Sequence, residues 1–463
     1  MLVDRAALDA YIQANSDAFV DELCDLVRLP SISTQANPGV QACAEALLGS
    51  MARSGLEGRL LPTAGQPVVF GQRLVNERLP TVLVYGHYDV QPVDPLDAWQ
   101  TPPFEPVVRD GRLYGRGSSD NKGQHLAQLL ALRSLLAVRG ELPLNVKVIL
   151  EGEEENGSPH LAACVEEHRE LLAADLAYTS DGPVHESGRP IVVLGVRGML
   201  SVELRARGAN RDVHSGNRGG VVPYPAWDLV QLLASLRRPD GRVAIDGFYD
   251  AVRPPTDAER DAIARLPLDL DAHLREYGIE GLPSPDEWGY YERLMLQPTL
   301  NIAGLHSGYT GEGIKTIVPH HAVAKLDMRL VPDQTPDAIF DLLARHVRAR
   351  APQVELVRLG DMRPSRTPID NPYTQTVLAA LREATGEEPY LVPSLGGSLP
   401  DYVFTQILGV PSLLVPYANP DQNNHAPNEN LELARFLMGI RTCATVLQRV
   451  AELGRGAQAS SPQ

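Results

Sequence analysis

The chain has 463 residues, of which 43% are hydrophobic and 22% charged, and both values are ordinary for a soluble globular protein. Its length favours two domains. Lys and Arg number 42 against 58 Asp and Glu, so the formal net charge at pH 7 is −16. Such an acidic surface disfavours nucleic acids and anionic membranes, and we expect neither as a partner.

The cysteines and the N-terminal segment bear on the compartment. Cys24, Cys43, Cys164 and Cys443 are far apart and lack the paired spacing of a zinc ribbon, which is typical of free thiols in a reducing compartment. The N-terminal segment is amphipathic and acidic, without the basic region and apolar core of a signal peptide. No stretch approaches the roughly 18 apolar residues that would span a membrane. We therefore expect a cytoplasmic protein.

The first part of the chain alternates helices with apolar strands. Apolar residues recur at helical spacing in 4–28, 39–53 and 118–140. Runs rich in β-branched residues predict buried strands within 80–92, 144–158 and 176–182. This order predicts an α/β domain with a mainly parallel sheet.

The pattern changes after about residue 196 to strands that alternate apolar and polar residues, as antiparallel strands with one exposed face do. From about residue 335 we expect the first pattern to return, with helices, a strand in 411–420 and a closing helix from 431. We predict a first domain formed by 1–196 and 334–463, and an inserted α+β domain, an antiparallel sheet plus helices, over 197–333.

Polar residues gather where the strands of the first domain end. His87 and Asp89 follow one strand, Asp120 precedes a helix, Asp181 follows another strand, and His425 follows the strand in 411–420. The stretch "EGEEENGS" (151–158) adds four glutamates at a further strand end. The carboxyl ends of parallel strands converge on one rim of a sheet, where ligands bind. Each residue alone is weak evidence, but the set predicts a metal site.

The residue types favour a catalytic metal centre. Mixed His and carboxylate ligands without Cys suit zinc, manganese or cobalt better than a structural zinc. Five ligands exceed the need of one zinc ion and suit two ions that share a carboxylate. Because alternate residues of a strand share a face, Asp89 is expected to accept a hydrogen bond from the second ring nitrogen of His87.

Longer motifs connect the chain to a known family. "VLVYGHYDVQPV", "DGRLYGRGSSDNKG", "EGEEENGS", "SDG", "DVHSGNRGG", "RLVP", "GGSLPD" and "NNHAPNE" occur in this order between about residues 20 and 450. The chain thereby resembles the aminoacylase/carboxypeptidase/dipeptidase family of co-catalytic metallopeptidases, and within it the dipeptidase branch related to carnosinases. The resemblance implies a metallopeptidase catalytic domain with an inserted lid and dimerisation domain, and hence a homodimer.

The resemblance also implies roles for the ligands. His87 and Asp181 would hold one divalent ion, Glu155 and His425 the other, and Asp120 would bridge both. We expect zinc, with manganese and cobalt as alternatives. Family members carry a cis peptide bond after the bridging residue, here Asp120–Asn121.

Glu154 matches the general base of the family. Residue chemistry agrees, because the attacking water needs one carboxylate near the ions that is not itself a ligand. Glu151 and Glu153 have no such role, and we expect both to be solvated. The other histidines, among them His125 and His160, are likewise expected at solvated positions.

Further residues are assigned by the resemblance alone. On composition His214 would be a surface histidine in a Gly-rich turn, but the family position stabilises the oxyanion, commonly in the site of the other subunit. Arg329 matches the residue that forks onto a substrate carboxylate. The same end of the substrate would be held by Gly397 and Ser398, with Thr316 and Asn301 as weaker candidates.

The predicted function is metal-dependent hydrolysis of the amide bond of a small carboxylate-bearing substrate, in the first place a dipeptide, by a hydroxide held between two ions. Leu395 departs from related dipeptidases, which often carry an acid there, so an N-acyl or N-carbamoyl amino acid amidohydrolase is the alternative. A non-catalytic carboxylate- or metal-binding protein would be expected to lack the base, and Glu154 is present.

Overall fold

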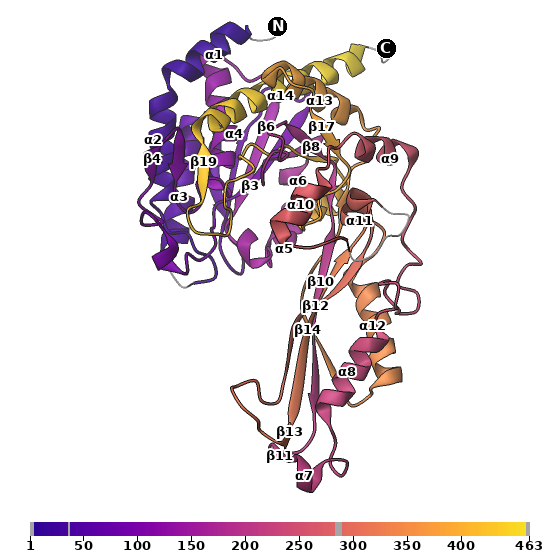
Figure 1. The fold of residues 1–463 in the computed structure, drawn as a ribbon. Coiled ribbons are helices and arrows are strands. Elements are labelled where there is room, and N and C mark those ends of the chain that lie inside the picture. The colour runs from indigo at the N-terminus through magenta and orange to yellow at the C-terminus, as the bar shows by residue number, and fades with distance from the viewer. Residues whose placement is uncertain (1–3, 36–37, 283–288, 460–463) are drawn as a thin grey trace. The chain divides into compact units, whose positions relative to one another are not determined.

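The computed structural model describes residues 4–35, 38–282 and 289–459, which form two compact units. Unit 1 runs through Gly195 and takes up the chain again at Arg366–Pro393 and from Pro400 onward. Unit 2 consists of Val196–Ser365 and Ser394–Leu399. The chain crosses from one unit to the other after Gly195, Ser365, Pro393 and Leu399. β9 (Gly195–Val196) and β16 (Ser365–Arg366) lie at the first two of these crossings. Figure 1 shows the elements of both units.

Unit 1 is built on an eight-stranded sheet. Its order is β1 (Glu57–Leu61), β2 (Val68–Arg73), β6 (Asn145–Glu151), β3 (Thr81–His87), β7 (Leu176–Thr179), β18 (Ser412–Leu414), β8 (Ile191–Val193) and β17 (Tyr390–Val392). The four central strands β6, β3, β7 and β18 run parallel. They are buried along nearly their whole length, which explains their continuous apolar sequences.

Helices cover both faces of this sheet. Alternate residues of β3 enter different cores: Val82 and Val84 belong to one and Leu83 and Tyr85 to the other. The first core is closed by α1 (Arg5–Ala14), α2 (Ser16–Val27), α3 (Gly39–Arg53), α4 (Lys122–Arg139), α13 (Pro372–Thr385) and α14 (Leu433–Ala459). The second is closed by α5 (Leu161–Glu167), α6 (Arg169–Leu172) and the helical segment Val403–Leu408.

Unit 1 also contains a small three-stranded sheet. It pairs β19 (Asn430–Glu432) with β5 (Arg112–Tyr114) and β5 with β4 (Val107–Arg109). A short helical turn covers Leu96–Ala98 and another covers Glu154–Asn156. Through the β19–β5 pair, this sheet connects the segment that follows β18 to the segment that precedes α4.

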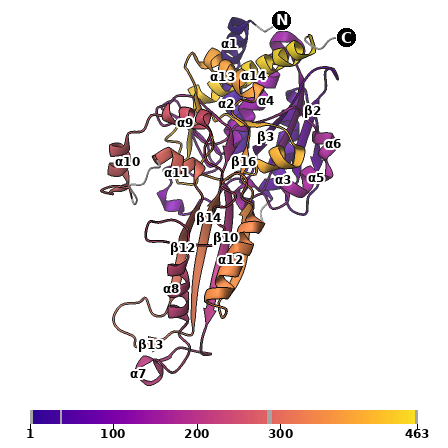
Figure 2. The same ribbon diagram turned by 90° about the vertical axis from the view of Figure 1, so that its right-hand side faces the viewer.

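Unit 2 is an antiparallel sheet with helices. Its strand order is β12 (Thr299–Ser307), β14 (His321–Leu330), β10 (Gly198–Arg207) and β15 (Glu355–Met362). Figure 2 shows α8 (Pro225–Ser235) and α12 (Pro336–Arg350) running beside these long strands. The remaining elements are β11 (Val213–His214), α7 (Ser215–Arg218), α9 (Asp257–Ala264), α10 (Leu270–Tyr277), α11 (Tyr290–Leu296) and β13 (Ile317–Val318).

The predicted fold class is confirmed: a mainly parallel α/β domain carries an inserted α+β domain. The second unit extends past residue 333, where we expected it to end. Strand β15 pairs with β10, and Ile339, Leu343 and Val347 of α12 lie in the core of unit 2.

Among the described residues, no helix combines the length and the apolar character needed to cross a membrane.

Candidate metal centre

His87, the last residue of β3, is fully buried and points its two ring nitrogens at different partners. Its Nδ1 lies 3.1 Å from the backbone oxygen of Asp89, and its Nε2 lies 3.1 Å from Oδ1 of Asp120. A proton on Nδ1 satisfies the carbonyl and leaves the Nε2 lone pair facing a carboxylate oxygen. Two acceptor atoms that face each other in this way fit a shared cation.

The structure gathers the five predicted ligands into two groups. One contains His87, Asp120 and Asp181, and the other contains Asp120, Glu155 and His425. Within each group the ligating atoms all lie within 4.8 Å of one another. Nε2 of His425 is 3.1 Å from Oδ2 of Asp120 and 3.1 Å from Oε2 of Glu155. Asp120 thus turns one oxygen toward each histidine, as a bridging ligand must.

The ends of the parallel strands explain this convergence. β3 supplies His87, β7 leads directly into Asp181, and the segment after β18 carries His425. Asp120 precedes α4, and the Asp120–Asn121 peptide bond is cis, as the resemblance implied.

Charge also indicates that cations belong here. Burial, followed by repulsion from Asp120, raises the pKa of Asp181 to about 7. Hydrogen bonds to Asp120 and Glu155 raise the pKa of His425 to about 10. Without ions, these pKa values favour a proton on Asp181 and a protonated His425, so the crowded carboxylates favour positive charge nearby. Nitrogen and carboxylate donors in two groups around a shared aspartate fit two divalent ions.

Glu154 lies beside the two groups but belongs to neither. Its Oε2 is 4.0 Å from Nε2 of His87, and its side chain is only 13% exposed. Burial and the nearby Asp181 and Glu155 carboxylates raise its pKa well above the usual value. The residue predicted as the base therefore lies near the two groups and is a member of neither.

Asp89 holds the turn that carries Glu154 and Glu155. Its Oδ1 accepts the backbone N–H of Glu154 at 3.1 Å, and its Oδ2 accepts that of Glu155 at 3.1 Å. The Ser33 hydroxyl donates to Oδ2 at 2.7 Å. Its Oδ1 is 3.4 Å from Nδ1 of His87, so the predicted contact is the longer one and the backbone oxygen of Asp89 takes the shorter.

The solvated positions expected for Glu151 and His125 are wrong. Glu151 is the buried end of β6 and accepts hydrogen bonds from the Tyr85 hydroxyl at 2.6 Å and the Ser158 hydroxyl at 3.0 Å. Burial raises the pKa of Glu151 to about 8. His125 is buried in α4 with Nδ1 2.9 Å from the carbonyl of His87. Both sit at buried positions of their elements, and a local sequence pattern does not reveal what covers these positions.

Two glutamine side chains that contact the site were not predicted from the sequence. Gln91 donates to Oε2 of Glu155 at 2.8 Å. Gln124 donates to the carbonyls of Ser119 at 2.9 Å and Gly182 at 3.1 Å, and accepts from the backbone N–H of Tyr417 at 2.8 Å. Gln124 therefore connects three loops that carry ligands. Its only signal in the sequence was its position one helical turn after Asp120.

The remaining predicted residues lie in unit 2. Nη1 of Arg329 donates to Oγ of Ser398 at 3.0 Å, and Nε of Arg329 lies 3.3 Å from Oδ2 of Asp327. Gly397 is exposed beside Ser398, and Asn301 faces Asp327 across the β12–β14 pair. The structure therefore places Arg329, Gly397 and Ser398 together.

His214 is exposed in β11, opposite Ile317 of β13. The neighbouring Thr316 carbonyl accepts the backbone N–H of Ser215 at 3.1 Å. Nδ1 of His214 accepts the backbone N–H of Gly216 at 3.0 Å, which assigns the proton of the neutral ring to Nε2. His214 therefore presents an outward-facing N–H donor.

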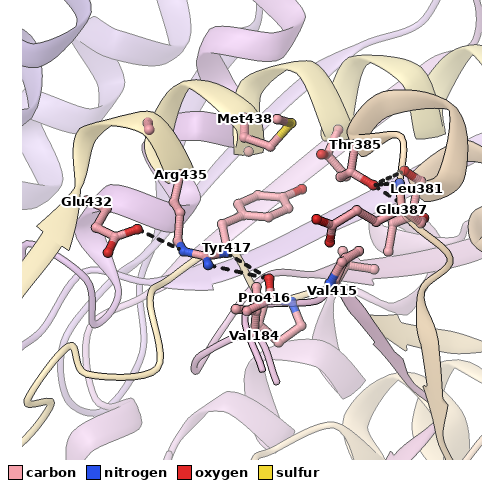
Figure 3. A pocket seen from close by; sticks show the side chains of 15 residues that line it. Val184, Leu381, Thr385, Glu387, Val415, Pro416, Tyr417, Glu432, Arg435 and Met438 are labelled. Atoms are coloured by element: carbon pink, nitrogen blue, oxygen red, sulfur yellow. Dashed lines mark hydrogen bonds and ion pairs between the residues drawn. The ribbon is translucent and has the colours of Figure 1, made fainter. Parts of the chain in front are cut away.

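A cavity of about 280 Å³ lies elsewhere in unit 1, lined by residues of α13, α14 and the segment after β18. Figure 3 shows Arg435 directed at Glu432, with which its Nε makes a 3.0 Å contact, and it also reaches the carbonyl of Gly188. Its guanidinium is thus already paired. None of the lining residues is a predicted ligand, so the strand ends remain the candidate site.

Comparisons with known proteins agree with this centre. The model of peptidase family M20/M25/M40 matches residues 83–449. The chain is 30% identical to the Beta-Ala-His dipeptidase of Homo sapiens, across 96% of this chain and 92% of that protein. It is 29% identical to a Cys-Gly metallodipeptidase of Candida albicans, across 92% of this chain and 93% of that protein.

Solved structures give the same result. An M20 family metallo-carboxypeptidase from Sulfolobus solfataricus is 36% identical with a TM-score of 0.88, covering 94% of this chain and 99% of that chain. Human carnosine dipeptidase 1 is 28% identical with a TM-score of 0.81, covering 97% and 99%. The family resemblance of the motifs is confirmed. The chain belongs to peptidase family M20/M25/M40 and is a metal-dependent peptidase.

Proposed function

We propose that this peptidase is a dinuclear dipeptidase that cleaves the amide bond of a small substrate with a free carboxylate. The observation that carries the proposal is the pair of ligand groups that share Asp120. The names of the dipeptidases to which the chain is similar over nearly its full length support the substrate class.

His87 and Asp181 would hold one ion, Glu155 and His425 the other, and Asp120 both. Zinc suits these donors, and manganese or cobalt is the alternative. When bound, two such ions polarise a carbonyl oxygen and lower the pKa of water. The chain contributes the ligand positions, because the strand ends fix them before any ion arrives.

Glu154 acts as general base and then as general acid. Its carboxylate takes a proton from the attacking water and delivers it to the leaving amine. Asp89 accepts one backbone hydrogen bond from Glu154 and one from Glu155. It therefore fixes the base and the neighbouring ligand within the same turn.

Unit 2 supplies the groups that recognise the substrate. The Nε2–H of His214 donates to the oxyanion that develops on the scissile carbonyl, an interaction worth about 3–4 kcal/mol at such positions. Arg329 and Ser398 bind the substrate carboxylate, assisted by the backbone of Gly397. Thr316 and Asn301 contribute weaker contacts, and the unit as a whole acts as a lid.

The protein assembles as a cytoplasmic homodimer through unit 2. β12 is an edge strand of its sheet, and its Ile302 and Leu305 are 51% and 56% exposed. On α8, Trp227 is 58% exposed and Val230 is 45% exposed. A second copy that covers these side chains would remove both an unpaired strand edge and apolar surface from water. We propose no partner among nucleic acids or membranes.

An N-acyl or N-carbamoyl amino acid amidohydrolase is the second candidate, favoured by one position. Leu395 offers no carboxylate for a substrate ammonium group. Its backbone oxygen lies 3.3 Å from the backbone nitrogen of Arg197, so this segment is fixed by main-chain contacts.

The test is a panel of free dipeptides, N-acetylated dipeptides and N-carbamoyl amino acids. Chelator-treated protein is assayed before and after zinc, manganese or cobalt is added. We expect free dipeptides to be cleaved and the activity to depend on the added metal. Cleavage of capped substrates alone would favour the amidohydrolase, and cleavage without any metal would contradict both candidates.

A further inference from the structure

Glu429 is a fully buried carboxylate that the mechanism so far does not use. It lies four residues after His425 in the "NNHAPNE" motif. Its Oε1 accepts from the backbone N–H of Ser119, the hydroxyl of Ser119 and the backbone N–H of Asp120, at 2.9, 2.9 and 3.0 Å. Its Oε2 accepts from Nη1 of Arg116 and from the backbone N–H of Gly117, each at 2.9 Å. Five donors thus converge on one side chain.

The backbone around Glu429 reinforces the same connection. Its carbonyl accepts the backbone N–H of Gly115 at 3.0 Å. The strand that follows it, β19, pairs with β5, which leads into the loop. The segment that carries His425 is therefore attached along its length to the segment that carries Asp120.

Only a carboxylate satisfies this arrangement. An ionised carboxylate accepts at both oxygens, whereas an amide has one accepting oxygen and a nitrogen that can only donate. Glutamine would replace one of the two oxygens by an NH₂ group. In one orientation this NH₂ group would face the three donors of Ser119 and Asp120, and in the other it would face the donors of Arg116 and Gly117. Arg116 supplies the compensating charge and is itself 2% exposed, with a second contact to the carbonyl of Pro92.

We propose that Glu429 is a positioning residue of the metal centre. It fixes the backbone at Asp120, so that one oxygen of this carboxylate faces His87 and the other faces His425, and it holds the distance between Asp120 and His425. Asp120 would thereby be placed to hold both ions. This inference rests on the ligand roles of the proposed function and deepens them, because it adds a residue that shapes the shared ligand without touching an ion.

The contact pattern distinguishes this role from general stabilisation. Three of the five donor groups belong to Ser119 and to Asp120 itself. Loss of the carboxylate therefore acts first on the orientation of a ligand. A purely structural residue would change the melting temperature and leave the metal affinity of the folded protein unchanged.

The test compares Glu429→Gln with Glu432→Gln. Glu432 is a suitable control because it lies three residues after Glu429, at the end of β19, and its carboxylate contacts Arg112 and Arg435, which lie outside the loop before Asp120. Zinc affinity is measured by competition with a chromophoric chelator, alongside circular dichroism, kcat and KM. For Glu429→Gln we expect the affinity for at least one zinc ion to fall about 10- to 100-fold and kcat to fall with little change in KM.

For Glu432→Gln we expect zinc affinity and kcat within about twofold of the unchanged protein, since its partly exposed ion pairs lie apart from the Asp120 loop and such pairs contribute little. A folded Glu429→Gln protein with unchanged zinc affinity overturns the proposal. If that variant does not fold, Ser119→Ala removes the hydroxyl donor to Oε1 and should weaken zinc binding about 2- to 10-fold. Unchanged binding in Ser119→Ala then overturns it.

The zinc measurement needs no substrate, so the two proposals can fail separately. Weaker zinc binding in Glu429→Gln together with an inactive unchanged protein would reject dipeptide hydrolysis and keep the positioning role. Dipeptide hydrolysis by the unchanged protein together with normal zinc binding in Glu429→Gln would support the proposed function and reject the positioning role.

Discussion

Adjacent glutamates after β6 make different contacts, and these contacts separate their roles. Glu155 faces His425 and accepts from Gln91, whereas the backbone N–H of Glu154 donates to Asp89 and its carboxylate lies 4.0 Å from Nε2 of His87. Glu153 lies 2.7 Å from Nδ1 of His160 and so already has a partner outside the centre. Of the three, only Glu154 has a buried carboxylate near the ligands that is left for proton transfer.

Replacing Glu154 by Gln should remove the base and spare the ligands. We expect kcat for dipeptide hydrolysis to fall about 10²- to 10⁴-fold. Zinc affinity should stay nearly unchanged, because Glu154 belongs to neither ligand group. Steady-state kinetics and the chelator competition check both. The control is Glu153→Gln, whose kcat should stay close to that of the unchanged protein; a larger loss in Glu153→Gln than in Glu154→Gln would reverse the assignment.

The gathering of the two His and carboxylate groups could be predicted from sequence because each member follows a strand or precedes a helix within a long motif. Glu151 and Glu429 could not, for the same physical reason. A charged side chain is expected to be solvated unless its partners are known, and those partners are distant in sequence: Tyr85 for Glu151, and the 116–120 loop for Glu429.

At the scale of elements, Glu22 joins three helices of unit 1. From α2 it accepts hydrogen bonds from Ser50 and Arg53 of α3 at 2.5 and 2.8 Å. On its other side Nη1 of Arg133 in α4 donates to it at 2.7 Å. Burial alone would raise the pKa of Glu22, but hydrogen bonds from Arg133, Ser50 and Arg53 outweigh it and lower the pKa to about 2.

This lowered pKa predicts a pH-dependent contribution to stability. The ionised Glu22 stabilises the fold at every pH above its unfolded pKa of about 4.5, and the contribution disappears as the pH falls toward 2. Glu22→Gln should therefore lower the free energy of unfolding by about 2–3 kcal/mol at pH 7. In thermal unfolding at several pH values, the gap between the two proteins should narrow from pH 5 downward.

Glu45→Gln provides the control for this measurement. Glu45 lies on α3 and is exposed, and its hydrogen bond comes from Gln41 on the same helix. Its melting temperature should follow that of the unchanged protein at every pH. A constant gap between Glu22→Gln and the unchanged protein down to pH 2 would show that the charge of Glu22 is not responsible.

The boundary between the units shows where element-level prediction fails. A helix after an antiparallel strand has the same local pattern in either unit, so α12 was expected in the first domain. The unit to which a helix belongs depends on what it packs against, and α12 packs against β10 and β15 of unit 2. Strand pairing over more than 150 residues, as between Val202 and Arg358, has no local signature.

At the scale of the whole molecule, the proposed reaction needs groups from two units. Glu154 and the ligands belong to unit 1, and His214 and Arg329 belong to unit 2. The exposed apolar side chains of α8 and β12 support a dimer formed through unit 2. In such a dimer the base and the oxyanion donor of one site can come from different subunits, which is a property that mixed dimers can test.

Mixed dimers of His214→Ala and Glu154→Ala subunits should regain activity if His214 acts across the dimer. Each variant alone lacks one group in both sites. A mixed dimer has one site with intact Glu154 from one subunit and intact His214 from the other, while its second site lacks both. Equal mixing should therefore restore about a quarter of the unmixed activity, since half of the dimers are mixed and each has one working site. Differently tagged subunits must first demonstrate exchange by co-purification. Exchange without recovered activity would place His214 and Glu154 of a working site in the same subunit.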